Sequence, residues 1–263
     1  MKIQSRGEGT SQESEAFVKA RELVERYGSD TLSYFNLRRD KRLFFLNDEI
    51  FLAYRVTKGV ALVSADPIGP PELVRPLMND FRNYCRENHW PLACFAASEE
   101  YVPLYRECGL RSFLVGEETV MKLDGFTLEG RKMSNLRHAV CKLEKNGATL
   151  EFMFNAGIPA HLRRELREVS LEWRGDKPET GFSMGLGRIF DTSDGDCLLC
   201  IAYDGNSKPI GFLQLAPVYP DIGYSLDIAR MINDSPNGLM EFMLANTAQF
   251  LKKRGCRYMS IHF

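Results

Sequence analysis

The sequence lacks the features that would place it in a special class of protein. It contains no uninterrupted apolar run of the roughly 18–20 residues needed to span a bilayer, and its start, MKIQSRGEGTSQESE, lacks the apolar core of a signal peptide. Its 34 Lys and Arg residues are balanced by 35 Asp and Glu residues, so no overall field attracts nucleic acid or an anionic membrane. The 263 residues, 44% of them hydrophobic, predict a soluble, cytosolic protein of one large or two smaller domains.

Residues typical of metal or nucleophilic sites are also few. The seven cysteines are an odd number scattered among apolar neighbours, which indicates reduced, buried thiols. Cys197 and Cys200 form a CxxC, but the surrounding run is apolar and has no second CxxC and no nearby histidine. This context favours core packing over zinc or redox chemistry. The four histidines have no evident catalytic partners, so no Ser-His-Asp or Cys-His arrangement is indicated.

Hydrophobic periodicity predicts an N-terminal helix in residues 1–30 and two α/β segments, 31–125 and 126–263. The first segment predicts strands at 43–46, 50–57, 60–69, 90–98 and within 112–123, with helices at 70–88 and 99–108. The second predicts strands at 148–154, 197–204, 209–218 and 257–263, with helices at 130–146, 159–173 and 238–254. The similar order indicates an α/β protein (α+β mixed sheets) with tandem acetyltransferase-like (GNAT) subdomains rather than a doubly wound dinucleotide fold.

The helix predicted at 130–146 concentrates positive charge in a neutral chain. Met133, Leu136, Val140 and Leu143 form its apolar stripe. Five cations, Arg131, Lys132, Arg137, Lys142 and Lys145, stand against Glu129 and Glu144. Such a helix can be an ordinary solvated surface or a surface that contacts phosphates. The next helix also carries arginines, but its glutamates offset them, and its predicted inward residues are Leu162, Leu166, Val169 and Trp173.

The segment TGFSMGLGRIFD, 180–191, places three glycines and Ser183 before Arg188. Glycines allow a backbone to approach an anion or an oxyanion closely, although a plain turn explains them equally well. The segment has Phe182 where an acetyl-coenzyme A loop has Arg or Gln, and it is neither a GxGxxG motif nor a Walker loop. Coenzyme A and nucleotide cofactors therefore lose support.

The segment GYSLDIARMINDSPNGLMEF, 223–242, combines Asp227 and Arg230 with a turn at Pro236–Gly238 and with Glu241 on the following helix. Residues three apart meet on a helical turn but face opposite sides of a straight strand, so the pattern alone leaves the geometry of the pair open. A surface ion pair is the alternative to a site.

Together these segments resemble the catalytic domain of the lysylphosphatidylglycerol synthases, also called phosphatidylglycerol lysyltransferases or multiple peptide resistance factors. The resemblance rests on GRKMSNLRHAV with KLEKNG, WRGDK followed by GFSMGLGR, and SLDIAR with SPNGLMEF. SADPIGPPE and ASEEYVPLYRECGLRSFLVGEETV extend it toward the N-terminus, over roughly residues 30–263. The family pattern continues past Phe263, so the resemblance implies an incomplete second subdomain.

The resemblance implies transfer of an amino acid, lysine by expectation, from aminoacyl-tRNA to phosphatidylglycerol by transesterification, with no cofactor and no metal. It implies lysyl-tRNA and phosphatidylglycerol as partners, a membrane-embedded region in a longer protein, and a place at the inner face of the cell membrane.

The resemblance also implies roles for individual residues. Asp227 would orient the substrate amine or accept a proton, and Arg230 would hold a phosphate or the oxyanion. Ser183, Arg188, Asn237 and Glu241 would line the aminoacyl pocket. Arg131, Lys132, Arg137, Lys142 and Lys145 would contact the tRNA backbone.

Two alternatives remain open at this stage. One is a transferase that modifies a peptide, as enzymes of the peptidoglycan cross-bridge do. The other is an inactive domain that binds tRNA or lipid.

Overall fold

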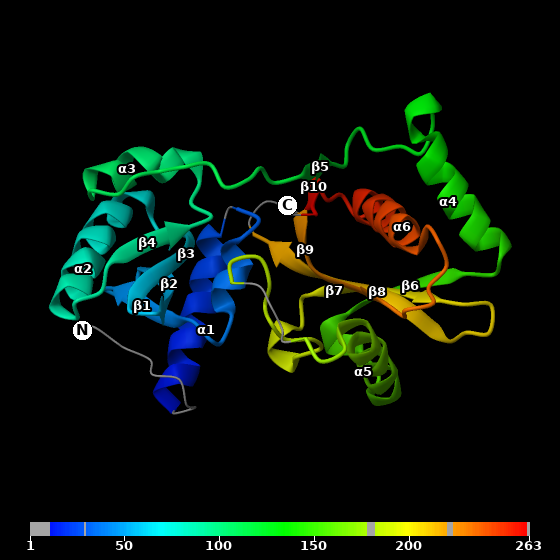
Figure 1. Cartoon of the computed structure of the whole chain (residues 1–263), viewed down its shortest axis with the longest axis horizontal. Helices are drawn as coiled ribbons and strands as arrows, with labels where there is room; N and C mark the ends of the chain where they lie inside the picture. Colours follow the sequence, from blue (N-terminus) through cyan, green and yellow to red (C-terminus); the bar gives the residue numbers. More distant parts are fainter. Residues whose placement is uncertain (1–10, 29, 178–181, 220–222, 262–263) are drawn as a thin grey trace. The chain divides into compact units, whose positions relative to one another are not determined.

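The computed structural model describes residues 11–28, 30–177, 182–219 and 223–261. These residues form two compact units, each with its own sheet (Figure 1). Unit 1 comprises the described residues up to Glu117, with 182–186 and 218–219 returning to it; unit 2 comprises the remainder from Glu118. The first subdomain therefore takes part of its structure from segments far along the chain.

Unit 1 is built on a four-stranded sheet in the order β1-β2-β3-β4. Its strands are β1 (Arg42–Leu46), β2 (Ile50–Thr57), β3 (Val60–Ile68) and β4 (Leu92–Phe95). The first three pair antiparallel, and β4 pairs parallel with β3. Asn47 and Asp48 both have positive φ, the geometry that a tight antiparallel hairpin requires. The strands expected at 43–46 and 50–57 are therefore confirmed, and these residues form the turn between them.

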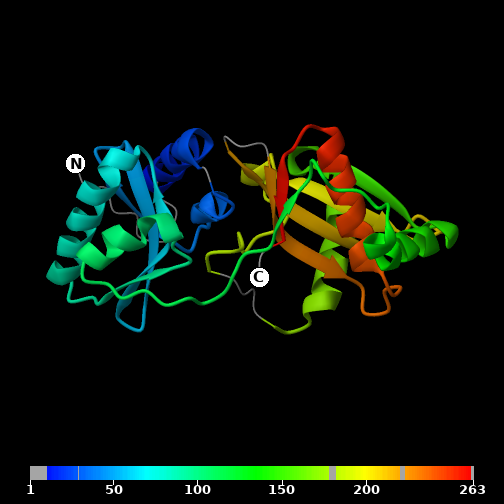
Figure 2. The same cartoon turned by 90° about the horizontal axis from the view of Figure 1, so that it is seen from above.

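Helices cover both faces of the unit 1 sheet. One face packs against α2 (Val74–Glu87) and α3 (Val102–Glu107), preceded by the short helices η2 (Pro71–Leu73) and η3 (Glu99–Tyr101). Phe81 of α2 meets Phe44 of β1 and Tyr54 of β2 edge to face. The views from the side and from above place α1 (Ser11–Tyr27) on the other side of the sheet from α2 (Figures 1 and 2). There α1 lies beside η1 (Ser33–Leu37), and Arg21 donates to the Tyr34 hydroxyl.

Unit 2 is built on a six-stranded sheet in the order β5-β10-β9-β8-β7-β6. Its strands are β5 (Val120–Lys122), β6 (Thr149–Phe154), β7 (Leu198–Tyr203), β8 (Pro209–Val218), β9 (Gly223–Met231) and β10 (Tyr258–Ser260). Strands β6, β7 and β8 pair antiparallel, and β10 pairs parallel with β9. Both units thus follow a meander with a helical crossover to a parallel strand: β3-α2-β4 in unit 1 and β9-α6-β10 in unit 2.

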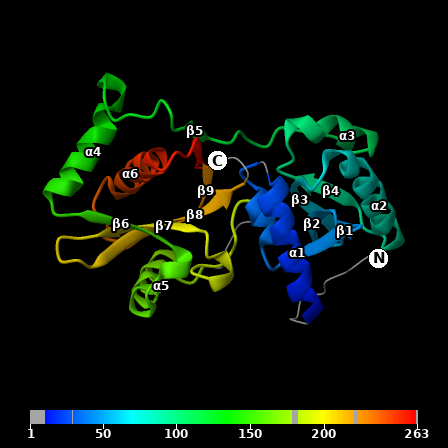
Figure 3. The same cartoon turned by 180° about the vertical axis from the view of Figure 1, so that it is seen from behind.

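The two faces of the unit 2 sheet hold separate apolar clusters. Helix α4 (Ser134–Lys145, preceded by η4, Arg131–Met133) and helix α6 (Leu239–Lys253) cover one face, with Leu143 and Phe242 buried there. Helix α5 (Ala160–Arg174) covers the other face, where Leu166 and Phe212 belong to one buried cluster. Figure 3, the view from behind, likewise shows α4 and α6 on one side of the sheet and α5 on the other. The smaller elements of unit 2 are η5 (Asn155–Gly157) and η6 (Thr192–Asp194).

Most predicted elements are confirmed, with two differences. The segment 112–123 was expected to be the last strand of the first subdomain, but only β5 is a strand there, and it joins β10 in the sheet of unit 2. Phe113, Leu114 and Val115 are 66–83% exposed, so their apolar side chains have no core to fill within the described chain. Strand β9 was not predicted, because Ser225, Asp227 and Arg230 interrupt its apolar pattern.

Two further expectations concern the core and the membrane. Cys197 and Cys200 are fully buried at β7, and burial raises the pKa of the Cys200 thiol to about 12, which confirms core packing. Within the described ranges, no helix has the length and apolar character to cross a membrane.

Candidate functional site

Strand β9 brings Asp227 and Arg230 to the same face of the sheet. Tyr224 and Leu226 pack into the cluster beneath α4 and α6, and so do Ala229 and Met231. Regular alternation would send 226 and 229 to opposite faces, so the alternation shifts by one residue between them. This shift leaves Asp227, Ile228 and Arg230 on the face of α5, where Ile228 joins the cluster around Phe212. The geometry that the spacing left open is therefore settled by an irregular strand.

Asp227 is held by a buried amide on the neighbouring strand. Gln214 of β8 is only 1% exposed, and its Nε2 donates to Asp227 Oδ2 at 2.6 Å and to the Arg188 carbonyl at 3.2 Å. Its Oε1 accepts from the backbone N–H of Phe190 at 3.3 Å. These contacts fix which end of the amide faces Asp227. Gln214 was not singled out in the sequence, although an amide inside the apolar run GFLQLAPV signals a buried partner.

The loop after the glycine-rich segment is held by a bidentate ion pair. Arg188 donates from Nε to Asp194 Oδ2 at 2.5 Å and from Nη2 to Asp194 Oδ1 at 2.7 Å, and Asp194 is buried. Asn155 donates to the carbonyls of Asp191 and Asp194, which anchors the same loop to η5. The guanidinium of Arg188 thus orders the loop whose backbone contacts Gln214.

Arg230 is buried, so it does not form the surface ion pair that was the alternative to a site. Its side chain is nearly fully buried, Nη1 donates to the Ser170 hydroxyl on α5, and Cζ lies 5.2 Å from the centre of the Trp173 ring. Trp173 was predicted to point inward, but it is 50% exposed and lies over the guanidinium; Leu162, Leu166 and Val169 are buried as predicted. Trp173 is the last of these positions, close to the end of α5, where it reaches Arg230 rather than the core.

Asn237 and Glu241 are not brought together with Asp227 and Arg230. Both side chains are exposed, at the turn before α6 and in its first turn, and α6 packs on the face of the sheet opposite α5. Gly238 has φ +93°, and a Cβ there would lie 3.1 Å from Ala139 of α4, so the turn requires glycine. The predicted SPNG turn is therefore explained by helix packing.

Ser183 belongs to unit 1 and is only 1% exposed. Its hydroxyl accepts from Ser64 of β3 at 2.9 Å, and Ser64 accepts from Lys41 Nζ at 2.7 Å. Lys41 is also buried; it donates to the Phe35 carbonyl at 2.9 Å and lies 5.1 Å from the Phe182 ring centre. This network fastens the segment 182–186 to unit 1. Gly181, the first residue of GFSMGLGR, lies outside the described residues.

Burial lowers the pKa of Lys41 to about 7. Between about pH 7 and the ordinary pKa, the unfolded chain holds a proton on this lysine that the folded chain lacks, so folding is favoured as the pH rises. We therefore compare the unfolding free energy of the wild type with that of Lys41→Met. We expect the difference to increase by about 1 kcal/mol for each pH unit between about pH 7 and about pH 9. Urea titrations across this range measure the difference, with Lys208→Met as an exposed control. Parallel curves for wild type and Lys41→Met would contradict it.

A second buried titratable group of unit 1, Asp66, lies in the SADPIG segment. The register of β3 against β2 shifts between Ser64 and Ile68, and Ala65 has φ +54°, so the strand bulges at this point. The bulge leaves Asp66 to accept from the Ser98 N–H at 2.9 Å and the Tyr105 hydroxyl at 2.8 Å. Burial raises the pKa of Asp66. These contacts join β3 to the segment before η3 and to α3. They give the aspartate of the SADPIG segment a structural role.

The predicted amphipathic pattern of α4 is confirmed. Val140 and Leu143 are buried, and Leu136 packs against the same cluster. Arg131, Lys132, Lys142 and Lys145 are exposed. Arg137 is exposed too, but its Nη1 donates to the carbonyls of Leu128 at 2.5 Å and Gly130 at 3.2 Å. It therefore fixes the loop before the helix.

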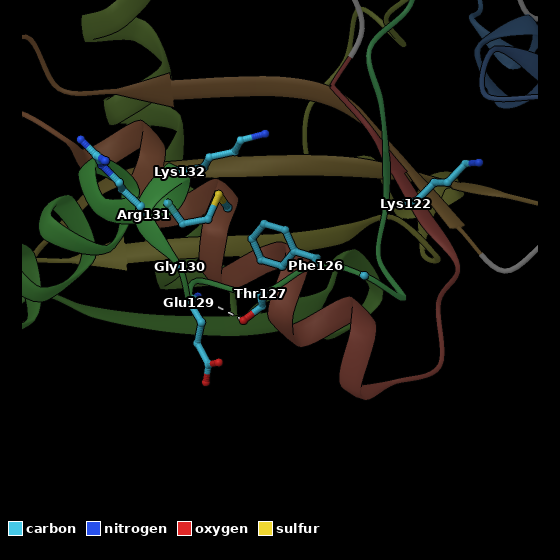
Figure 4. A pocket seen from close by; sticks show the side chains of 9 residues that line it. Lys122, Phe126, Thr127, Glu129, Gly130, Arg131 and Lys132 are labelled. Atoms are coloured by element: carbon cyan, nitrogen blue, oxygen red, sulfur yellow. Dashed lines mark hydrogen bonds between the residues drawn. The ribbon is translucent and has the colours of Figure 1, made fainter.

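A pocket of about 480 Å³ opens beside the start of this helix (Figure 4). Phe126 and Met133 contribute its apolar lining, and Lys122, Arg131 and Lys132 contribute positive charge. Glu129 is its single acidic lining residue. No sequence pattern singled out Lys122 or Phe126.

The repeated meander and parallel crossover define the class: a mixed α/β protein with tandem acetyltransferase-like subdomains. The chain belongs to the family described as phosphatidylglycerol lysyltransferase, C-terminal, whose model matches residues 21–263. The family suggested by the sequence motifs is therefore confirmed.

Relatives and solved structures agree with this assignment. The chain is 36% identical over 245 residues to the lysylphosphatidylglycerol biosynthesis bifunctional protein LysX of Rhodococcus jostii, covering 92% of this chain and 22% of the relative. For the Mycobacterium avium LysX the identity is 34%, over 92% of this chain and 21% of the relative. The chain thus spans about a fifth of the length of these relatives.

Among solved structures, L-PGS from Bacillus licheniformis matches with a TM-score of 0.85 and 25% identity, over 93% of this chain and 74% of that one. The C-terminal domain of a putative lysylphosphatidylglycerol synthetase from Agrobacterium fabrum matches with a TM-score of 0.87 and 23% identity, over 95% and 79%. FemX matches with a TM-score of 0.51 and 12% identity, over 99% of this chain and 88% of that one, which shows a shared fold only.

Proposed function

We propose that this chain transfers an amino acid, lysine by preference, from aminoacyl-tRNA to phosphatidylglycerol. The observation that carries the proposal is the placement of Asp227 and Arg230 of the SLDIAR segment on one face of β9, within a chain of this family. The LysX relatives are named for lysylphosphatidylglycerol biosynthesis, which supports the same substrate.

The reaction exchanges one ester for another. The glycerol hydroxyl of the lipid attacks the carbonyl carbon of the aminoacyl group, a bond forms between the glycerol oxygen and that carbon, and the bond to the ribose oxygen breaks. The proton lost by the glycerol hydroxyl is returned to the ribose oxygen. A site for this reaction must position both substrates, move the proton and stabilise the oxyanion that forms on the carbonyl.

Asp227 suits the role of proton acceptor, or of partner for the substrate ammonium group, in this reaction. It is partly exposed, and the Gln214 amide donates to one of its carboxylate oxygens, which orients the carboxylate. An ionised carboxylate can hold the substrate ammonium group or accept a proton. Arg230 would supply positive charge on the same face, held in place by Ser170 and Trp173.

The other predicted pocket residues have less support from the geometry. Burial of Ser183 favours a structural part for its hydroxyl, and the pairing of Arg188 with Asp194 favours a part in ordering the loop. Asn237 and Glu241 are exposed at the start of α6, on the face of the sheet opposite α5, so only the motif supports Asn237 as a pocket residue and Glu241 as a partner for the cationic side chain of the amino acid.

The exposed cations of α4 suit the tRNA. Arg131 lies in η4 and Lys142 in α4, a segment with few acidic residues, and an RNA backbone requires positive charge rather than base readout. We expect Arg131→Ala with Lys142→Ala to raise the KM for aminoacyl-tRNA several-fold and to lower the salt slope of binding by about 1–2. Titration of the tRNA affinity against salt measures this slope.

The matched control for this pair is Arg164→Ala with Lys208→Ala. These residues are also exposed, and the double substitution removes the same charge from α5 and the β7–β8 turn. An equal loss in both double variants would show that net charge, and not α4, attracts the tRNA.

The test of the function is incubation with phosphatidylglycerol vesicles and a panel of labelled aminoacyl-tRNAs, with lipid products separated on thin-layer plates. Labelled lysyl lipid is the expected product. Label in an added peptide acceptor but not in lipid would favour a peptide-directed transferase. tRNA binding without any transfer would favour an inactive binding domain.

A further inference from the structure

The pocket beside α4 is preformed by contacts that do not involve a ligand. Lys252 of α6 donates to the Phe126 carbonyl at 2.8 Å, and Phe126 N–H donates to the Leu123 carbonyl at 3.0 Å. At the other end of the loop, Arg137 binds the carbonyls of Leu128 and Gly130. The chain from Leu123 to Gly130 is therefore tied to both α4 and α6 in unit 2. A loop fixed in this way can bind a ligand at a low cost in conformational entropy.

The lining combines a flat apolar ring with cations. Figure 4 shows Phe126 between Lys132 and Lys122, with the Glu129 carboxylate directed away from the two ammonium groups; Met133 also lines the pocket. Phe126 is partly exposed, and its ring contributes to the pocket while the residue also packs against the core. The volume of about 480 Å³ lies within the ~300–1,000 Å³ usual for pockets that take small ligands or parts of larger ones.

An aromatic ring beside two lysines fits a base joined to a phosphate. Base stacking on a protein aromatic ring is tolerant of sequence, and lysines neutralise the adjoining phosphate. The lining includes Arg131 and Lys132 of η4, the short helix directly before the exposed cations of α4, so an RNA backbone held by these cations would pass beside the pocket. A base inside a duplex is stacked on its neighbours and cannot lie on a protein ring, so the nucleotide must be unpaired.

We infer that this pocket binds one unpaired nucleotide of an RNA, with its base against Phe126 and its phosphate between Lys122 and Lys132. The inference rests on the proposed use of aminoacyl-tRNA, and it adds a single-strand site to the phosphate contacts of α4. It also separates the roles of neighbouring residues: Phe126 recognises a base, Lys122 and Lys132 bind charge, and Arg137 positions the loop.

The test uses the full chain and a single-stranded RNA tetranucleotide that contains 2-aminopurine, whose fluorescence falls when it stacks. Wild-type protein should quench the probe, and Phe126→Ala should weaken binding about tenfold. Phe126→Trp should restore quenching, because it retains a stacking surface. The matched control is Phe113→Ala, which removes an exposed ring from unit 1 and should change nothing.

A second variant keeps the test independent of folding. Lys122 is exposed on β5, so Lys122→Gln should preserve the fold while lowering the salt slope for the tetranucleotide by about 0.7. Unchanged affinity in Phe126→Ala together with an unchanged slope in Lys122→Gln would overturn the inference. Equal affinity for a hairpin with the same bases paired would also overturn it.

The comparison with transfer activity separates this inference from the proposed function. Quenching that depends on Phe126, in a protein that forms no labelled lipid, supports the nucleotide site and rejects the lipid acceptor. Lipid product with no effect of Phe126 or Lys122 on RNA binding supports the function and rejects the site. Loss of binding to phosphatidylglycerol vesicles in Lys122→Gln, with RNA binding unchanged, would instead assign the pocket to the lipid headgroup and reject the nucleotide.

Discussion

Replacement of Asp227 by Asn is expected to abolish detectable transfer of the amino acid to lipid while leaving the chain folded. General acid–base catalysis by one positioned side chain contributes roughly 10²–10⁴-fold, so a fall in kcat of at least about 100-fold is expected. Asn has nearly the same size as Asp and can still accept the hydrogen bond from Gln214 through its carbonyl oxygen. The unfolding midpoint should therefore move little. Single-turnover transfer with labelled aminoacyl-tRNA separates the chemical step from binding.

Asp48→Asn is the matched control for this variant. Asp48 is exposed in the β1–β2 turn of unit 1 and has φ +58°, a conformation that Asn adopts readily. It loses the same charge by the same chemical change, and its transfer rate should equal that of the wild type. A wild-type rate in Asp227→Asn would remove Asp227 from the reaction.

Replacement of Arg230 by Ala is expected to abolish transfer and to destabilise unit 2 as well. The side chain is 4% exposed, so truncation removes buried packing against Trp173 and the hydrogen bond to Ser170. Losses of this kind typically cost about 2–4 kcal/mol. Urea unfolding measures the cost, and the transfer assay under conditions where the variant remains folded measures the activity.

Two further variants divide this effect into its parts. Ser170→Ala removes the hydroxyl that accepts from Arg230 and should cost about 1 kcal/mol with most transfer activity retained. Arg230→Lys keeps the charge but not the planar guanidinium, and it should recover stability more than activity. If Arg230→Lys transfers the amino acid at the wild-type rate, charge alone is sufficient at this position.

The fold could be predicted wherever one periodicity dominates a segment. The apolar runs that became β7 and β8, and the stripe of α4, encode their own burial. Strand β9 could not be predicted, because its polar residues point into a polar network on one face. The shift between Leu226 and Ala229 also breaks the two-residue period on which strand prediction depends. The prediction of a strand within 112–123 was wrong over most of its length for the opposite reason. Its apolar residues predict a buried strand, yet Phe113 and Leu114 are exposed.

The motif residues of the candidate site could be predicted from the sequence, but the residues that hold them in place could not. Asp227 and Arg230 stand in a recognisable segment. Three polar residues hold other residues in place without belonging to a motif: Gln214, Ser170 and Lys41. Only the tertiary contacts show what each of them binds. The same holds for the pocket at Phe126, because no sequence pattern indicates that Lys122 and Phe126 lie beside the cations at 131–132.

The hydrogen bonds of Gln214 constrain which mutations this gene could tolerate. A single-nucleotide change converts a glutamine codon into a glutamate codon, and the side chains have the same length. Glutamate at 214 would place a second carboxylate against Asp227 and would offer no donor to the Arg188 carbonyl. Each carboxylate would then favour protonation of the other, because two ionised carboxylates repel each other at this distance. This single-nucleotide mutation would therefore raise the affinity of the site for a proton while leaving its shape nearly intact.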